Sequence, residues 1–382
     1  MDIISWDSVS WVWDYAVPFL LILTVLVFVH ELGHYLVARR NGVYVETFSI
    51  GFGPEIFGWN DASGTRWKIS MVPLGGYIRM FGDEDATSRP GADLDTMSQE
   101  DRGKSFYYKS LGQRSAIVFA GPLANFIFAI GVLMVMFMTI GQPFSSPRIT
   151  EVLAESAAEA AGLREGDLIT SLDGEEIERF EDIVMIVSQN PDLSMEVTVD
   201  REGGVHSFMV TPSLEEGTDR FGNAYRVGRL GIKGTMREYV QHDPLTAAYR
   251  SVETTYTIVT STLKAVGQMI AGTRSADELG GPLRIAQMSG EVAQYGLSTV
   301  FWFMAVLSVN LGLINLFPVP LLDGGHLLYF AAEAVRGKPI GERAQEIGFQ
   351  IGLVMVLSLM VFATWNDLSQ MGFFKFLQGL AG

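Results

Sequence analysis

The sequence predicts a polytopic α-helical membrane protein that carries one inserted α+β domain. Hydrophobic residues make up 48% of its 382 residues and charged residues only 18%, a more apolar balance than soluble chains of this length show. The apolar residues gather in four stretches, each near the ~20 residues that ~30 Å of hydrocarbon requires. Between the second and third stretch, a long segment has the alternation and tight turns that are typical of a water-soluble domain.

The net charge and the absence of cysteine exclude some classes of function. The formal net charge is −16, which argues against nucleic acid as a partner because phosphate binding needs clustered Lys and Arg. The chain has no cysteine, so any metal must be held by His and carboxylate side chains. Residues 1–16 contain no Lys or Arg. We therefore expect no cleavable signal peptide, and the first apolar segment should remain in the mature protein.

The four predicted spans run from about Pro18 to Val37, Ser115 to Ile140, Ser298 to Phe317 and Ile347 to Ala363. Cationic residues flank them in two loops, one from about 38 to 114 and the other from about 336 to 346. The positive-inside rule places both loops in the cytoplasm. Both termini and the segment from about 141 to 296 are then expected to face outward.

Residues 44–80, between the first two spans, have strand character. Gly51–Pro54 reads as a turn cluster, and Arg66–Val72 alternates polar and apolar residues as a strand does. Pro73–Gly76 should break this strand before Tyr77–Met80 resumes it. The pattern predicts a β-hairpin beside the first span, which either takes part in function or only plugs the cytoplasmic side. Residues 83–103 are predicted to form a polar loop.

The outward segment predicts a compact α+β unit over residues 141–212. A short helix at Ala157–Leu163 ends at a glycine, and the Asp167–Leu172 strand leads into an Asp173–Gly174 turn. A second helix and two further strands complete the unit, at Glu181–Gln189, Met195–Val199 and Ser207–Thr211. Residues 213–296 are predicted to be a connector. Its amphipathic helix at 246–271 is expected to lie along the membrane surface.

The motif that carries the chemistry is HELGH, which spans residues 30–34 near the end of the first span. His30 and His34 are four residues apart, so both imidazoles project from one face of a helix, as one tetrahedral zinc ion requires. Glu31 lies about 100° around the helix. It can reach a water on the metal without being a ligand and can act as general base. Polar groups inside an apolar span are costly and indicate function.

A third protein ligand is expected from residues 315–325, NLFPVPLLDGG, at the end of the third span. Two prolines and two glycines should end the helix there. Asp323 then lies on irregular backbone at membrane depth, which is tolerated only where protein or a wet cavity covers it. Asp323 is therefore the best third ligand. His326 is a rival, but three residues further on it should point elsewhere.

Together, HELGH and NLFPVPLLDGG resemble the site-2 protease family of intramembrane zinc metalloproteases. Residues 156–169, followed by Asp173–Gly174, resemble a PDZ domain; the alternative is a generic α+β domain with a similar turn. A single PDZ between the second and third spans is similar to the bacterial RseP-type branch, as are Gly121–Asn125 and Gly280–Pro282. The best-known members carry two tandem PDZ domains, so Arg226–Gly234 is here either a remnant or the connector to the membrane.

The resemblance implies regulated proteolysis of single-span membrane proteins, such as anti-sigma factors and leftover signal peptides, in the bacterial inner membrane. The active site would face the cytoplasm and the PDZ domain the periplasm. A peptide or protein bound to the PDZ domain, and membrane lipid, are further expected partners. Carried over by residue, the resemblance implies that zinc is held by His30, His34 and Asp323 with Glu31 as catalytic base, and that substrate contacts the strand pair at Gly75 and Gly76, Asn315 and Asn310.

Other interpretations remain open at this stage. Asn310 and Asn315 could instead bond neighbouring helices to each other. The whole chain could be a non-catalytic membrane scaffold whose PDZ domain binds partners, although the intact Glu31 argues against this. A metal transporter would need a polar path across the bilayer, and the predicted spans contain too few ionisable groups for one.

Overall fold

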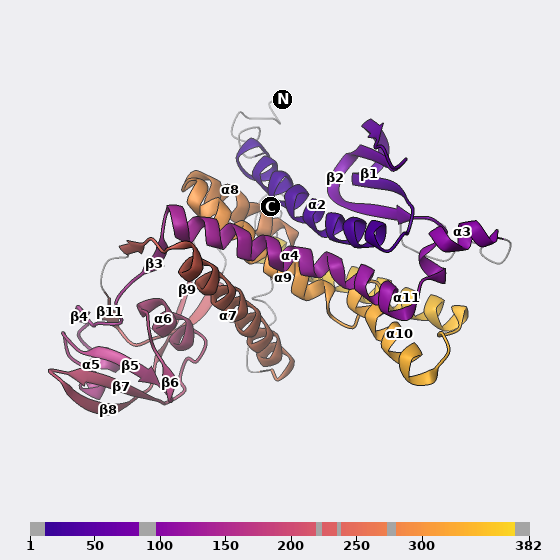
Figure 1. Cartoon of the computed structure of the whole chain (residues 1–382). Helices are drawn as coiled ribbons and strands as arrows, with labels where there is room; N and C mark the ends of the chain where they lie inside the picture. Colours follow the sequence, from indigo (N-terminus) through magenta and orange to yellow (C-terminus); the bar gives the residue numbers. More distant parts are fainter. Residues whose placement is uncertain (1–11, 84–96, 219–223, 235–237, 273–279, 371–382) are drawn as a thin grey trace, which may run out of the picture. The chain divides into compact units, whose positions relative to one another are not determined.

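The computed structural model describes residues 12–83, 97–218, 224–234, 238–272 and 280–370 (Figure 1). The chain forms two compact units. The first, which we call the membrane unit, combines residues 1–135 with residues 244–366. The second, which we call the inserted unit, contains residues 136–243 together with residues 367–382.

Four helices in the described part of the chain are long and apolar enough to cross a membrane, which confirms the prediction of a polytopic helical membrane protein. They contain α2 (Val17–Arg40), α4 (Leu111–Thr139), α9 (Leu297–Asn315) and α11 (Glu342–Gln370). A π-helical turn, η1 (Val12–Ala16), leads into α2. Each helix agrees with a predicted span and extends it at one end or both, although α4 ends one residue earlier than predicted and α9 two residues earlier.

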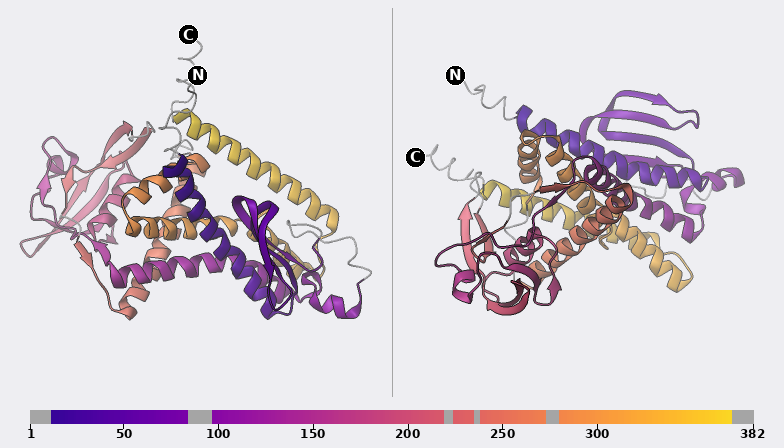
Figure 2. Two further views of the ribbon diagram at one scale, coloured as in Figure 1. Left: turned by 90° about the horizontal axis from the view of Figure 1, so that it is seen from above. Right: turned by 60° about the vertical axis from the view of Figure 1, so that its left-hand side comes forward.

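The membrane unit packs around α2. Helices α8 (Pro282–Gln294) and α9 lie against it, around Ile22, Leu26 and Phe303 (Figure 2). On another side α4 approaches so closely that a Cβ on Gly33 would overlap the Ala120 carbonyl oxygen. The glycine therefore determines how near these two helices can lie.

A β-hairpin made of β1 (Val45–Asn60) and β2 (Arg66–Met80) packs on α2, as Figure 2 shows. The predicted turn at Gly51–Pro54 and the predicted break at Pro73–Gly76 are both wrong, because the strands run through them. Register shifts absorb these residues, and Gly51 and Gly75 adopt φ of 89° and 124°. Glycine and proline mark bulges here and not strand ends.

The hairpin turns back at residues 61–65, where Asp61 ties it to α2. One carboxylate oxygen of Asp61 accepts bonds from the Ser63 and Thr65 amides. The other accepts bonds from Tyr35 Oη of α2 at 2.7 Å and from Trp67 Nε1 at 3.0 Å. Burial alone would raise the pKa of Asp61, but these bonds hold it well below its usual range. Asp61 therefore remains a carboxylate that fixes the hairpin on the helix.

Within the hairpin, residues 47–50 pair with 66–69 on one side and with 76–79 on the other. Phe48 is fully buried and stacks on Trp67 with ring centroids 4.2 Å apart. In the described part of the chain, segment 76–80 has a strand partner along one edge only. Of the predicted loop 83–103, residues 84–96 lie outside the described residues, and its end forms the helix α3 (Gln99–Lys104) instead of a loop. A short 3-10 turn, η3 (Phe106–Tyr108), leads toward α4.

Two further helices complete the membrane unit. The predicted amphipathic helix exists as α7 (Pro244–Ile270); its buried face includes Ala247 and Ser251, and it packs on α9. Its position on a membrane surface stays a prediction. Helix α10 (Asp323–Arg336) follows α9 after a non-helical stretch, and α11 follows α10.

The inserted unit is an α+β domain, as predicted. Its main sheet has the order β6-β5-β7-β8, formed by Glu175–Glu176, Leu168–Leu172, Met195–Arg201 and Gly204–Val210. Helices α5 (Ala157–Ala161) and α6 (Phe180–Ser188) contribute to one apolar core with this sheet. Asp173 and Gly174 both have positive φ between β5 and β6, which confirms the predicted turn.

The predicted end of this domain at residue 212 is wrong. Beyond it, β9 (Ser213–Thr218) pairs with β10 (Ala224–Arg229), and β11 (Ile232–Lys233) pairs with β4 (Glu151–Val152). Finally β12 (Glu238–Val240) pairs with β3 (Gln142–Phe144), and Leu230 lies in the core. Residues 226–234 are therefore part of the domain and not a connector. The β4–β11 and β3–β12 pairings join positions some 80 to 100 residues apart, which a local pattern cannot reveal.

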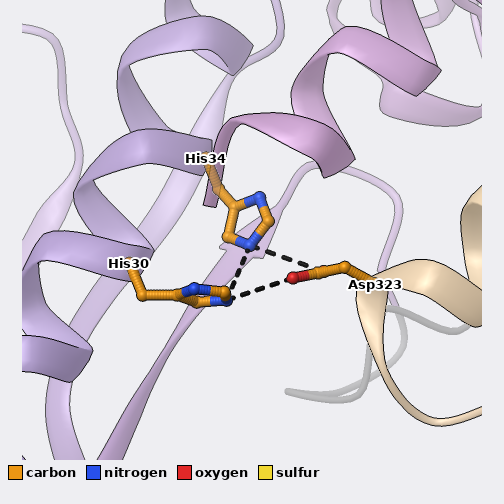
Figure 3. A group of neighbouring side chains, drawn as sticks. All are labelled: His30, His34 and Asp323. Atoms are coloured by element: carbon orange, nitrogen blue, oxygen red, sulfur yellow. Dashed lines mark hydrogen bonds and ion pairs between the residues drawn. The ribbon is translucent and has the colours of Figure 1, made fainter. Parts of the chain in front are cut away.

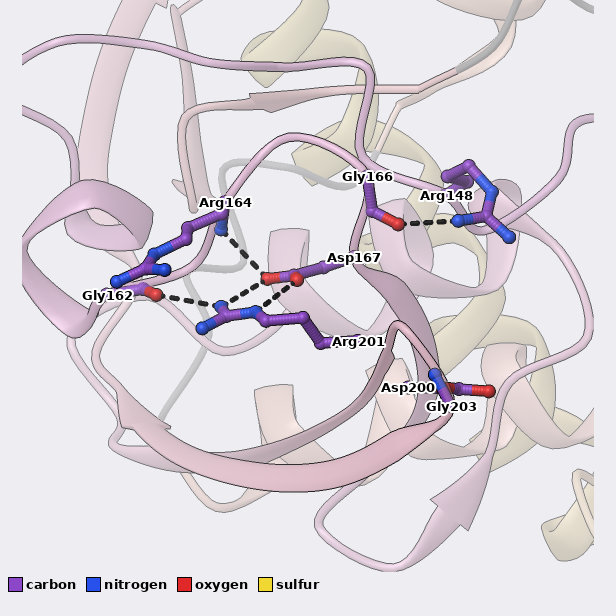
Figure 4. Close-up of polar contacts among 8 residues, drawn as sticks. All are labelled: Arg148, Gly162, Arg164, Gly166, Asp167, Asp200, Arg201 and Gly203. Atoms are coloured by element: carbon purple, nitrogen blue, oxygen red, sulfur yellow. Dashed lines mark hydrogen bonds and ion pairs between the residues drawn. The ribbon is translucent and has the colours of Figure 1, made fainter.

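A buried ion pair organises the turn before β5 (Figure 4). Asp167 is 1% exposed and accepts bonds from Arg201 Nε at 2.7 Å and Arg201 Nη2 at 2.8 Å. The Arg164 amide donates a third bond at 2.8 Å, while Arg201 also donates to the Gly162 carbonyl. Burial opposes ionisation of Asp167, but Arg201 keeps its pKa below the usual range. The Gly-Asp pair at 166–167 thus joins the end of α5 to β7.

Candidate metal centre

Three side chains from α2 and α10 converge on one point (Figure 3). His30 Nε2 lies 3.2 Å from His34 Nε2 and 3.1 Å from Asp323 Oδ2, and His34 Nε2 lies 3.5 Å from Asp323 Oδ1. Both histidines are 8% exposed. Within the described part of the chain, this cluster is the group of His and carboxylate side chains that has metal-binding spacing. The structure therefore brings together the three predicted ligands.

The donor atoms fit a zinc ion. Tetrahedral zinc with bonds of ~2.0–2.1 Å separates its ligand atoms by about 3.3 Å, which agrees with the three distances in the cluster. His34 Nδ1 lies 2.9 Å from the Ile117 carbonyl oxygen. Since a carbonyl can only accept, His34 Nδ1 carries the hydrogen and Nε2 presents a lone pair to the cluster. The His34 lone pair and the Asp323 carboxylate thus face each other at 3.5 Å, an arrangement that a shared cation stabilises.

The backbone around Asp323 explains how a residue so far along the chain reaches α2. Helix α9 ends at Asn315, and a stretch that contains Pro318 and Pro320 separates it from α10, which begins at Asp323. A Cβ on Gly324 would overlap the Leu316 and Phe317 carbonyl oxygens, and one on Gly325 would overlap the Val319 oxygen. The two glycines therefore allow the chain to fold tightly back. The carboxylate also lies at the positive end of α10.

A cavity of about 810 Å³ adjoins the three ligands. Glu31 and Asn315 line it, as do residues 76–78 of the hairpin. The backbone N–H of Ile78 donates a hydrogen bond to the Glu31 carboxylate. The side chain of the predicted base, the metal ligands and one strand edge thus border a single space.

The remaining predicted residues divide into two groups. Asn315 and Gly76 line the cavity, and so does His326, which is not one of the three converging side chains. Asn310 and Gly75 are not among the lining residues. Asn310 Oδ1 accepts a bond of 3.0 Å from Thr262 of α7, which agrees with its alternative role between helices. Substrate binding by Asn315, Asn310, Gly75 and Gly76 stays a prediction.

Sequence reasoning gave no role to two features beside the metal centre. Asn125 of α4 is fully buried, and its amide nitrogen lies 3.1 Å from His30 Nδ1. Arg114, also of α4, donates from Nη2 to Glu333 of α10 at 2.6 Å, at the wall of the cavity. An amide in the middle of an apolar span was a usable signal for Asn125. No local pattern connects Arg114 with a partner 219 positions away.

An HExxH pair on a membrane-crossing helix, completed by a distant carboxylate, defines a membrane-embedded metalloprotease. The model of peptidase family M50 matches residues 18–359, so the chain belongs to this family, the site-2 protease family. A Rhizobium meliloti protein whose name describes it as a zinc metalloprotease is 47% identical over 363 residues, which cover 93% of this chain and 97% of that protein.

Two further relatives support the same assignment. An Agrobacterium fabrum protein, also named as a zinc metalloprotease, is 47% identical over 94% of this chain and 96% of its own length. The metalloprotease MmpA of Caulobacter vibrioides is 37% identical over 95% of this chain and 98% of its own length. The chain is therefore a membrane zinc metalloprotease.

Proposed function

We propose that this protease cuts single-span membrane proteins within or beside the bilayer, with anti-sigma-factor-like proteins and leftover signal peptides as its substrates. One observation carries the proposal. The metal cluster and the edge of β2 border the same cavity, and that cavity lies against membrane-crossing helices. A peptide bond can therefore approach the cluster while it is paired to a strand.

The chemistry is peptide-bond hydrolysis. Zinc held by His30, His34 and Asp323 would supply a Lewis acid that activates water and polarises the scissile carbonyl. Glu31 accepts the proton of the attacking water and passes it to the leaving amine. The Ile78 amide, which hydrogen-bonds Glu31, keeps this carboxylate directed at the cavity. Asn315 lies in the cavity wall, where its amide can bond the substrate backbone.

The hairpin can supply hydrogen bonds to a helical substrate that unwinds. The peptide bonds of a membrane helix are sealed by internal hydrogen bonds, which must be replaced when the helix unwinds. Among the described residues, 76–79 pair with 47–50 along one edge only. Their other edge, toward the cavity, is suited to pairing with an extended substrate by strand addition. Gly76 supports this, since a Cβ there would lie 3.1 Å from Val27 and 3.5 Å from Glu31, so its missing side chain lets the strand lie close to α2.

The orientation of the chain in the membrane is proposed from the positions of its Lys and Arg residues. The cationic loops at 38–114 and 336–346 favour a cytoplasmic active site in the bacterial inner membrane, with the inserted unit in the periplasm. Reporter fusions at residues 90 and 200 test this, and they should give opposite signals. Equal signals would contradict the orientation. The inserted unit is proposed to be a PDZ domain that controls access to the site and binds a peptide or protein.

The decisive experiment replaces the base but keeps the metal. The purified Glu31→Gln protein, reconstituted in vesicles with a single-span substrate, should cleave about 10²- to 10⁴-fold more slowly than wild type. Its zinc content should be unchanged, because Glu31 is not a ligand. A wild-type protein that binds such substrates without cleaving them would favour the scaffold interpretation instead. Cleavage at the wild-type rate by Glu31→Gln would remove Glu31 from the mechanism.

A further inference from the structure

Asn125 contacts His30, one of the three proposed zinc ligands, at Nδ1, the ring nitrogen that does not face Asp323. It is fully buried on α4, with its amide nitrogen 3.1 Å from His30 Nδ1, while its amide oxygen is buried and has no hydrogen-bond partner among the residues that the structure describes. A buried unpaired carbonyl costs roughly 1–3 kcal/mol. The nitrogen and oxygen of an amide are assigned from their surroundings, since the two orientations have the same shape.

The two orientations have opposite consequences for zinc. If the amide nitrogen donates to His30 Nδ1, the imidazole hydrogen lies on Nε2, which then has no lone pair for a metal. If the amide oxygen faces Nδ1 instead, Nδ1 carries the hydrogen and donates it. His30 Nε2 then presents its lone pair to His34 and Asp323, and the unpaired oxygen gains a partner. Only this second arrangement agrees with a zinc site.

The same face of α4 supports both histidines. Ile117, Gly121 and Asn125 recur every four residues, so they lie along one side of the helix. The Ile117 carbonyl accepts from His34 Nδ1 at 2.9 Å. A Cβ on Gly121 would overlap the His34 ring, so this glycine makes room for the imidazole. Asn125 completes the row beside His30.

Helix α9 contacts α4 at Asn125, away from the side-chain amide. Ser308 Oγ donates to the Asn125 backbone carbonyl at 2.8 Å, and Gly312 lets α9 approach the Asn125 side chain. From these contacts we propose that Asn125 is a positioning residue, whose amide oxygen accepts the His30 Nδ1 hydrogen and thereby fixes the tautomer and ring orientation that bind zinc. The proposal rests on the zinc site of the proposed function and deepens it. It does not depend on the identity of the substrate.

The test compares zinc affinity in three variants by chelator competition on the purified protein in detergent. Asn125→Leu removes the acceptor at nearly constant volume and should weaken zinc binding about 10- to 100-fold, as loss of such outer partners typically does. Asn125→Asp keeps an acceptor and should bind zinc at least as tightly as wild type. Ser308→Ala, the matched control, loses a bond to the same residue but no bond to His30, and its zinc affinity should be unchanged.

The visible spectrum of the cobalt-substituted protein provides a second readout, which does not require substrate. It should change in Asn125→Leu and remain like wild type in Ser308→Ala. Zinc affinity of Asn125→Leu within twofold of wild type would overturn the proposal. If Asn125→Leu does not fold, a marked loss of affinity in folded Asn125→Asp would overturn it equally. Failure of Glu31→Gln to lose activity would reject the catalytic role of Glu31 and leave these affinities unaffected.

Discussion

At the scale of single residues, the candidate metal centre consists of groups that are expensive to bury. His30, His34 and Asp323 come from helices separated by almost the whole chain, and each gives up water to lie within 3.5 Å of the others. Such groups are retained where an ion compensates for their desolvation. The third ligand should therefore be as important for metal affinity as either histidine.

Asp323→Ala is expected to lose zinc. Removal of one of three protein ligands should weaken binding by more than about 100-fold, beyond the usual effect of an outer partner. Metal analysis after dialysis against a mild chelator measures this. His326→Ala is the matched control, because His326 lines the cavity without joining the cluster, and it should retain its zinc. The reverse result would make His326 the third ligand.

Asp83, which lies outside the membrane spans, makes the stability of the folded protein depend on pH. Burial raises its pKa to about 7, although bonds from the Met80 amide and Tyr107 Oη favour the ionised form. In the unfolded chain an Asp ionises near pH 3.9. Between pH 4 and pH 7 the folded state therefore holds a proton that the unfolded state releases. Asp83 lowers stability progressively over this range, by on the order of 2–4 kcal/mol at its upper end.

Asp83→Asn removes this titration. The apparent melting temperature of wild type should fall between pH 4.5 and pH 7.5 by more than that of Asp83→Asn, and the variant should be the more stable of the two at pH 7.5. Thermal unfolding in detergent at both pH values measures the difference. Parallel pH dependence in the two proteins would show that Asp83 does not hold a raised pKa.

At the scale of elements, the crossing of α2 and α4 determines the geometry of the candidate metal centre, because α2 carries both histidines and α4 contacts their ring nitrogens. The approach depends on Gly33, where a Cβ would overlap the Ala120 carbonyl and lie 2.7 Å from the Ala124 Cβ. Close backbone contact through small residues is the usual way for helices to associate in membranes.

Gly33→Ala should push the two helices apart. We expect a loss of about 1–3 kcal/mol in stability from overpacking and a weaker zinc site, since His34 is the next residue. Gly131→Ala is the control in the same helix pair, because a Cβ there meets nothing within 4 Å. Thermal unfolding and zinc affinity of the two variants measure the effect. Equal behaviour of the two alanine variants would exclude a close α2–α4 contact.

At the scale of the whole molecule, the strands at the start and end of the segment 142–240 of the inserted unit lie side by side. Strands β3 and β12 pair so that Phe144 lies opposite Glu238, although 93 residues separate them in the chain. A two-residue hairpin turn can therefore replace everything between them without stretching the flanking chain. The strand pairing thus makes a clean deletion possible.

Replacing residues 145–237 with Asn-Gly should leave the membrane unit folded and loaded with zinc, because all three ligands and Glu31 lie outside the inserted unit. Cleavage of a short, pre-trimmed substrate should be retained, and cleavage of a substrate with a bulky outward domain should increase. Both rates are measured in vesicles with zinc content as the control. Loss of cleavage of the short substrate in a zinc-loaded deletion variant would mean that the unit is needed for productive binding.

The sequence by itself determined the features that depend on local spacing. Four spans follow from the length of apolar runs, the histidine pair from helical periodicity, and the Asp173–Gly174 turn from its need for positive φ. The position of Asp323 beside the two histidines was also predictable, because irregular backbone at membrane depth is tolerated only where protein or a wet cavity covers it.

Only the tertiary structure decided what depends on partners distant in the chain. Strands β1 and β2 continue through their glycines, and the inserted unit extends to residue 243. Asn310 forms a hydrogen bond with α7. The tertiary structure also placed Asn125 behind His30, 95 residues away. In each case the local preference of the residues is weak. The structure that forms depends on pairing and burial between segments that lie far apart in the sequence.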